Sequence, residues 1–191
     1  MIKEFNALDE IQKYYDKESN TYIFKEDSDY IDWVVLYFNF NANANIDVAN
    51  IKAYDITAKD IHAEDIDCRH LIAKNITAKN INAFNIGADD IEAFEDIKAG
   101  DINVKNIDAC FIMANDIDAE NIRALDIIAT SDISAIDITA SDINAFDIKA
   151  RDISYGAVCF AYNSIKCRSI KGRRKNAKHF VLDGKIEVEN E

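Results

Sequence analysis

The sequence predicts an all-β solenoid, and two regularities along the chain carry this prediction. A large aliphatic residue recurs about every five residues between positions 46 and 153, in 22 repeats of which 21 have Ile and one has Leu71. The residue two positions later is Ala in 18 repeats, and the residue directly before the aliphatic one is Asp or Asn in 20. The repeated unit is therefore Ile-x-Ala-x-Asp/Asn, and it occupies residues 46–155.

A period of five excludes the common regular structures. On an α-helix, residues five apart lie ~140° apart around the axis, so the isoleucines would form no stripe. On a continuous strand they would alternate faces, because five is odd. A chain that is extended for three residues and then bends places Ile and Ala on one side in every repeat. We expect both to point inward, in coils that hydrogen-bond to the coils above and below, with no ligand channel along the axis.

The Asp or Asn before each inward residue is expected at a corner. Short side chains of this kind bond to nearby backbone amides and tolerate tight turns. His70 and Phe111 take this position in the two remaining repeats. For His70 we expect a structural hydrogen bond and no catalytic role.

The segment ITAKNINAFNIGADDIEAF, together with the rest of positions 46–155, resembles the pentapeptide-repeat family. The usual motif of that family has Ala two residues before the large residue. Here Ala lies two residues after it, and the earlier position is often charged, as at Lys59 and Glu64. The resemblance implies a right-handed quadrilateral β-helix with four repeats per coil, so that 22 repeats would give about five and a half coils. Two spacings of six residues, Ile91 to Ile97 and Ile127 to Ile133, predict a bulge at a corner.

Residues 1–45 lack the repeat and are expected to form a small α+β N-terminal cap. Residues 2–15 have an amphipathic helical pattern, and residues 21–25 and 31–40 have the composition of strands. Such a cap would cover the open end of the solenoid. The alternative is an assembly surface that docks to another chain.

Residues 156–191 are expected to hold a degenerate last coil, a basic linker and a C-terminal β-hairpin. The hairpin is predicted over residues 180–188, around the turn signal Asp183–Gly184. Seven Lys and Arg residues lie between positions 166 and 178. They are interpreted as a solvated linker, with a site for an acidic partner as the alternative.

Charge and composition narrow the classes of partner. Residues 46–155 have 10 basic and 22 acidic residues, hence a net charge of −12 of the −13 total. Direct binding of nucleic acid or of an anionic membrane is therefore not expected of the solenoid. No signal peptide or apolar run of ~20 residues is present, and the four cysteines lack metal-site spacing. These features predict a cytoplasmic protein, of bacterial type by its resemblance, in which Cys68 is an inert interior thiol.

No catalytic residue, cofactor-binding residue or metal ligand stands out, and no small-molecule substrate is evident. The leading interpretation is a non-enzymatic structural or protein-interaction module, with a protein partner or self-association. One alternative follows from the resemblance: a DNA-mimicking protein that interacts with DNA gyrase and protects it from quinolones. Another is a component of a phage or surface assembly.

A possible interaction face follows from four repeats per coil. That stacking would align three apolar residues beside three asparagines, with Phe94 and Ile136 on the opposite face. The six are Phe84, Leu125, Phe146, Asn82, Asn103 and Asn144. The alternative is that these side chains only stabilise adjacent coils.

Overall fold

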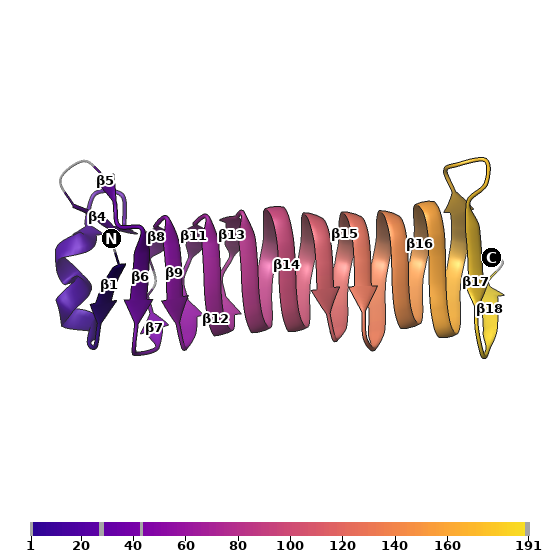
Figure 1. Cartoon of the computed structure of the whole chain (residues 1–191), viewed down its shortest axis with the longest axis horizontal. Coiled ribbons are helices and arrows are strands. Elements are labelled where there is room, and N and C mark those ends of the chain that lie inside the picture. The colour runs from indigo at the N-terminus through magenta and orange to yellow at the C-terminus, as the bar shows by residue number, and fades with distance from the viewer. Residues whose placement is uncertain (1, 27–28, 43, 190–191) are drawn as a thin grey trace.

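The chain forms a long β-solenoid of about seven turns, and strands make up 76% of it. A computed structural model describes residues 2–26, 29–42 and 44–189. Figure 1 shows a rod of stacked coils with a short helix at the N-terminal end and a projecting loop near the C-terminal end. The predicted solenoid is confirmed.

The described elements follow one another along the rod. The N-terminal ones are β1 (Ile2–Phe5), the 3₁₀-helix η1 (Leu8–Tyr14), β2 (Tyr15–Asp16), β3 (Thr21–Ile23), β4 (Lys25–Glu26), β5 (Asp29–Tyr30), β6 (Trp33–Leu36) and β7 (Phe40–Asn41). The repeats form β8 (Asn45–Asp47), β9 (Asn50–Ala53), β10 (Asp55–Thr57), β11 (Asp60–His62), β12 (Asp65–Ile72), β13 (Asn75–Ala78), β14 (Asn80–Ala114), β15 (Asp116–Ala129) and β16 (Asp132–Gly172). The chain closes with β17 (Lys178–Val181) and β18 (Lys185–Val188).

The inward positions are those that the repeat predicts. All 22 aliphatic residues of the repeat are at most 2% exposed. The Ala positions are buried as well, or pack partly buried against this core, as Ala88 and Ala124 do. Each buried Ile contributes roughly 2–3 kcal/mol of transfer free energy, so the repeat itself builds the core.

The coil has three repeats, and the prediction of four is wrong. Ile61 pairs with both Ile46 and Ile76 in parallel register, so each partner lies three repeats away along the chain. The motif is the same on every side, so the phase of the isoleucines does not fix the number of sides. Complementary side chains three repeats apart do distinguish a three-sided coil from a four-sided one. Lys52 Nζ, for example, lies 2.7 Å from Asp67 Oδ2 in the next coil. The right-handed turn remains a prediction.

Three sides result, and each is named after its first repeat. The Ile46 side contains β8, β11 and β13, and the Ile51 side contains β6, β9 and the start of β12. The Ile56 side contains β7, β10 and the end of β12. The long strands β14, β15 and β16 wind over all three sides (Figure 1).

The two six-residue spacings are accommodated as predicted, by a local change of register. Ala93 pairs with Ala78, 15 residues back, whereas the amide of Asp96 donates to Asn80 Oδ1, 16 residues back. At the second spacing Ala129 pairs with Ala114, 15 residues back, whereas Ile133 pairs with Ile117, 16 residues back. One extra residue is thus absorbed at each corner.

The Asp and Asn residues do not occupy the corners, contrary to expectation. The bend falls one residue earlier, at Ala49, Tyr54, Lys59 and Glu64, and the Asp or Asn then begins the next strand. Its side chain stacks on the equivalent residue of the neighbouring coil: Asn75 Nδ2 donates to Asp60 Oδ1 at 2.7 Å. The hydrogen-bonding role is right, and its partners lie across coils.

The N-terminal segment covers its end of the solenoid, but its helix is shorter than predicted. Residues 2–5 of the predicted helix form β1, which pairs in parallel with β6. Hydrogen bonds to β6 satisfy the backbone N–H and C=O groups of these residues, so a helix is not needed to satisfy them. Of the two predicted strands, 21–25 matches β3 and the start of β4, and 31–40 is represented by β6 and the start of β7. Phe5, Tyr14 and Phe24 form an aromatic cluster over the first coil, with ring centroids 5.2–6.4 Å apart.

The prediction of a C-terminal β-hairpin is wrong. Both β17 and β18 pair in parallel with β16, as the last strands of the solenoid. Asp183–Gly184 lies at a corner between them, where a Cβ on Gly184 would overlap the carbonyl oxygen of Asn163. Glycine is needed here for close approach between coils, and sequence alone does not distinguish this from a hairpin turn.

Candidate interaction surface

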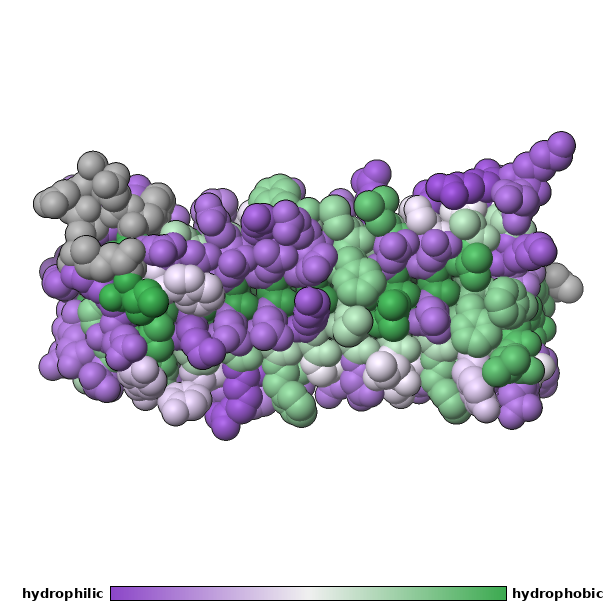
Figure 2. Space-filling model, viewed as in Figure 1, coloured by the Kyte–Doolittle hydropathy of each residue, from purple (hydrophilic) through white to green (hydrophobic). Residues whose placement is uncertain are grey.

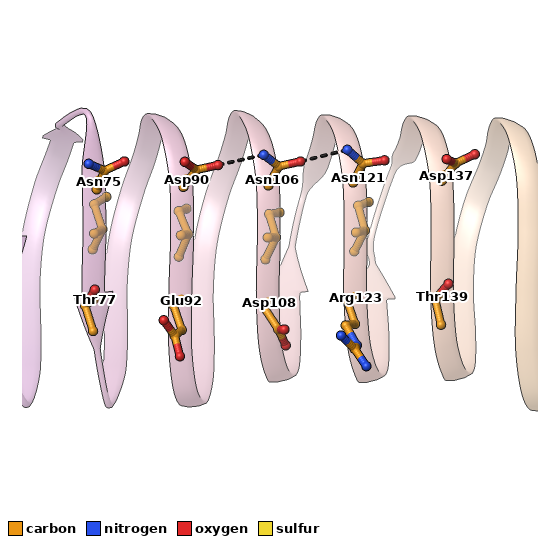
Figure 3. Close-up of a pocket in the computed structure, with 14 residues that line it drawn as sticks. Asn75, Thr77, Asp90, Glu92, Asn106, Asp108, Asn121, Arg123, Asp137 and Thr139 are labelled. Carbon is orange, nitrogen blue, oxygen red and sulfur yellow. Dashed lines mark hydrogen bonds between the residues drawn. The ribbon is translucent and has the colours of Figure 1, made fainter.

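Each side of the solenoid presents two outward rows of side chains. One row holds the residues directly before the inward residue, and we call it the Asp/Asn row. The other holds the residues directly after it, and we call it the variable row. Figure 3 shows both on the Ile46 side, with the Asp/Asn row from Asn75 to Asp137 and the variable row from Thr77 to Thr139. Any contact surface on a flat side must be built from these rows.

The Ile46 side has a shallow groove between its rows, lined by polar groups that satisfy one another. Asn121 Nδ2 donates to Asn106 Oδ1 at 2.7 Å, and Asn106 Nδ2 donates to Asp90 Oδ1 at 2.6 Å (Figure 3). The variable row mixes signs: Glu92 and Asp108 are followed by Arg123 in the next coil (Figure 3). These features are typical of a solvated face with coil-joining hydrogen bonds.

Several corner and face charges are paired between coils as well. Lys105 Nζ lies 2.7 Å from Asp89 Oδ1 and lowers the pKa of that carboxyl, while the same contact raises the pKa of Lys105. Arg69 binds Asp55 through two hydrogen bonds, at 2.9 and 3.1 Å, and likewise lowers its pKa. Part of the solenoid's acidity is therefore neutralised locally.

The Ile56 side has aspartates in successive coils of its Asp/Asn row. Asp101 pairs with Asp116, and the amide of Asp132 donates to Asp116 Oδ1 at 3.0 Å. Desolvation, followed by the charges of Asp147 and Asp116, raises the pKa of Asp132. The backbone amides bound by these carboxylates give the row a structural role. Among the residues that the structure describes, no cluster of three or more His, Cys, Asp or Glu is placed to hold a metal ion.

The Ile51 side differs from the other two, because its rows become apolar towards the C-terminus. Phe111 and Val158 replace Asp or Asn in one row, and Met113, Ile128 and Phe160 occupy the other. Phe180 of β17 pairs with Phe160, with ring centroids 5.1 Å apart. We call these six residues the apolar strip: Phe111, Met113, Ile128, Val158, Phe160 and Phe180.

The apolar strip is accessible and borders a groove. Met113 is 40% exposed, Val158 37% and Phe180 46%. The inward residues Ile127 and Ile143 form the floor between the rows, and Asp126, Asp142 and Asn144 complete the lining. In Figure 2, apolar surface lies over the middle of the rod and again over β16 to β18 at its C-terminal end, while the part nearer the N-terminal cap is more hydrophilic. Contiguous exposed apolar surface of this kind is typical of contact sites.

The predicted interaction face is not one surface, since it depended on four repeats per coil. Asn82 lies on the Ile51 side beside Asp67, Asn103 lies on the Ile56 side beside Asp118, and Asn144 follows Ile128. Phe84 adjoins Gly100, whereas Phe146 stacks on Tyr162, with ring centroids 5.3 Å apart.

Leu125, the remaining member of that face, lies with Cys110 and Phe94 at another corner. Phe94 had been expected on the opposite face, together with Ile136, which here lines a groove with Glu120. Only Asn144 borders the apolar strip.

The apolar strip was missed, although the sequence contained a signal for it. Phe111 was noted as a departure from the motif. With three repeats per coil, Met113 and Ile128 become neighbours, and they are two of the three large apolar residues directly after an inward residue in the repeats. If Phe111, Met113 and Ile128 are aligned with three repeats per coil, they fall on one side and predict this surface.

The reactive side chains have structural surroundings. Burial raises the pKa of the Cys68 and Cys159 thiols to about 12, so both are protonated at neutral pH. His70 Nδ1 lies 3.1 Å from Asn85 Nδ2, the hydrogen bond expected of this row. Two residues of the basic stretch have partners in their own chain: Lys166 pairs with Glu189 and Arg168 with Asp152.

Comparison of the chain with protein-family models, with curated proteins and with solved structures gives no match. Among the described residues, no helix has the length and apolarity that a membrane span requires.

Proposed function

We propose that this protein is a non-enzymatic β-solenoid that acts as a structural or protein-interaction module. The apolar strip is the observation that carries the proposal. On a solenoid whose outward rows are otherwise mostly polar, the strip brings six large apolar side chains together on one side. Aromatic and Met side chains of this kind are enriched at protein interfaces.

The rigidity of the rod supports the same function. Side-chain bonds such as Asn75–Asp60 and Asn106–Asp90 join successive coils, in addition to the parallel backbone ladder. A surface held by such a ladder is preorganised, which reduces the entropic cost of binding. We propose that the solenoid presents the strip in a fixed geometry to another protein surface.

The test compares two lysine substitutions of matched position. Ile128→Lys puts a charge in the strip, and Ser134→Lys puts the same charge in the variable row of the Ile56 side. Proximity labelling in the source cell identifies the proteins that are reproducibly labelled by the wild-type protein. Those proteins should no longer be labelled by the Ile128→Lys variant and should still be labelled by the Ser134→Lys variant. The same neighbours with both variants would contradict an interaction role for the strip, provided that circular dichroism shows both to be folded.

The gyrase-interacting and particle-component alternatives remain predictions. A DNA mimic needs a continuous acidic surface, and the ion pairs Lys52–Asp67, Arg69–Asp55 and Lys105–Asp89 interrupt the acidity here. A supercoiling assay with purified gyrase tests that alternative directly.

A further inference from the structure

We propose that the partner of the apolar strip is a second copy of this chain, packed face to face on the Ile51 side with its long axis antiparallel. This inference rests on the proposed function in that it uses the same strip, and it names the occupant. It follows from how charge is distributed along the Asp/Asn row of that side.

The Asp/Asn row beside the C-terminal part of the strip is acidic at one end and basic at the other. In the Asp/Asn row Asp126 pairs with Asp142, and Asp142 Oδ1 accepts a hydrogen bond from the amide of Val158 at 2.8 Å. Val158 then pairs with Lys178. The row therefore reads Asp126, Asp142, Val158, Lys178 over four successive coils. Asp126 and Lys178 are both exposed.

Such a row is complementary to itself when reversed. A two-fold axis parallel to the strands, between Asp142 and Val158, would place Asp126 of one copy opposite Lys178 of the other, and would do so twice. The variable row obeys the same operation: Ile128 would face Phe180, and Asn144 would face Phe160. At both ends, opposite charges thus meet beside an Ile128–Phe180 contact, and in the middle Val158 and Phe160 cover Asp142 and Asn144.

The parallel alternative does not have this complementarity. With both rods pointing the same way, the two-fold axis would lie along the rods and exchange the two rows. Asp126 would then face Ile128 and Lys178 would face Phe180, so neither charge would meet an opposite one. Flat β-faces pack at ~10 Å with aligned strands, a separation that side chains such as Ile128 and Phe180 can fill. The charge pattern therefore selects the antiparallel arrangement.

A zero-length carbodiimide cross-link tests this pairing directly. Within one chain, Asp126 and Lys178 are three strand spacings apart, or ~14 Å, too far for direct amide formation. In the proposed dimer they are adjacent. We expect a cross-linked peptide pair joining residues 126 and 178, and mixed ¹⁴N- and ¹⁵N-labelled protein should show that it forms between copies. A cross-linked dimer without this pair would overturn the proposal.

Charge exchange gives a second, independent readout. Asp126→Lys and Lys178→Asp should each raise the dimer dissociation constant about tenfold or more in sedimentation experiments, and the double variant should restore it. Asp118→Lys, on the variable row of the Ile56 side, is the matched control and should change nothing. If the double variant is no better than the single ones, the pairing is wrong.

Small-angle scattering separates this dimer from other assemblies. Because the proposed axis overlaps only the last four coils of each rod, the dimer should be longer than the monomer but shorter than an end-to-end dimer, with a doubled cross-section in its middle. End-to-end assembly would nearly double the maximum dimension and leave the cross-section unchanged. A wild-type monomer at every concentration, or an end-to-end dimer, would overturn the inference. If the proposed dimer is absent but Ile128→Lys still abolishes the labelling of nearby proteins in the cell, the proposed function stands and only the dimer is wrong. If that labelling is also unchanged, the proposed function is wrong as well.

Discussion

Asn121 donates its side-chain amide to Asn106 across 2.7 Å, and Asn106 in turn donates to Asp90 across 2.6 Å. Three consecutive coils are thus joined by one line of hydrogen bonds on the Ile46 side. Because an amide both donates and accepts, Asn in the middle of the line satisfies both neighbours. An aspartate there would be an acceptor only and would repel Asp90.

Asn106→Asp should therefore destabilise the solenoid, by about 1 kcal/mol at neutral pH. Chemical denaturation measures the loss. Asn144→Asp is the control, because the neighbouring positions of its own row hold Ile128 and Phe160 and no carboxylate. If the two variants unfold at the same denaturant concentration, the amide line contributes nothing to stability.

Asp132→Asn should raise stability at neutral pH. The pKa of Asp132 is raised in the folded protein, so folding is opposed while this carboxyl is ionised, and wild-type stability should improve as pH falls through the folded pKa. The gain from Asn is expected to be a few tenths of a kcal/mol, because the side chain is exposed and its charge interactions are screened. Thermal melts at pH 7 and pH 4 should show the advantage of the variant shrinking at the lower pH. A constant advantage would show that ionisation of Asp132 is not its cause.

Asp152 should have the opposite pH dependence. Hydrogen bonds from Ser169, Arg151 and Arg168 lower its pKa to about 2, below the ~3.9 of an unfolded chain. Its contribution is therefore present above about pH 4 and is lost as pH falls towards 2. Asp152→Asn should melt below wild type at pH 6, and the two curves should converge near pH 2. Melting curves that remain equally separated down to pH 2 would contradict the lowered pKa.

Ile117→Asp should cost several kcal/mol, because Ile117 is 1% exposed and an aspartate there would bury an unpaired charge. Glu120→Asp, a little further along on the exposed surface, should cost little. Urea titrations of both variants compare the two positions in one coil. Similar unfolding midpoints would mean that the inward and outward assignments are wrong.

The inward set could be predicted because each repeat carries its own information. Ile and Ala must be buried whichever side they occupy, so Ile117 and Ala119 were correctly assigned without knowing the coil. The number of sides depends on contacts between repeats, such as Lys52 with Asp67, and these are invisible to a five-residue pattern. The strip was missed for the same reason, since Met113 and Ile128 become neighbours only when three repeats complete a coil.

Engineered cysteine pairs measure the coil length most directly, and the composition of every face depends on it. In a Cys110→Ser background, Asp108→Cys with Arg123→Cys places the pair on adjacent strands, ~4.8 Å apart and within disulfide range. Asp108→Cys with Ile128→Cys would be adjacent only with four repeats per coil. Under mild oxidation, mass spectrometry should find the 108–123 disulfide formed and the 108–128 pair still reduced. Preferential closure of the 108–128 pair would contradict the three-sided coil and the apolar strip with it.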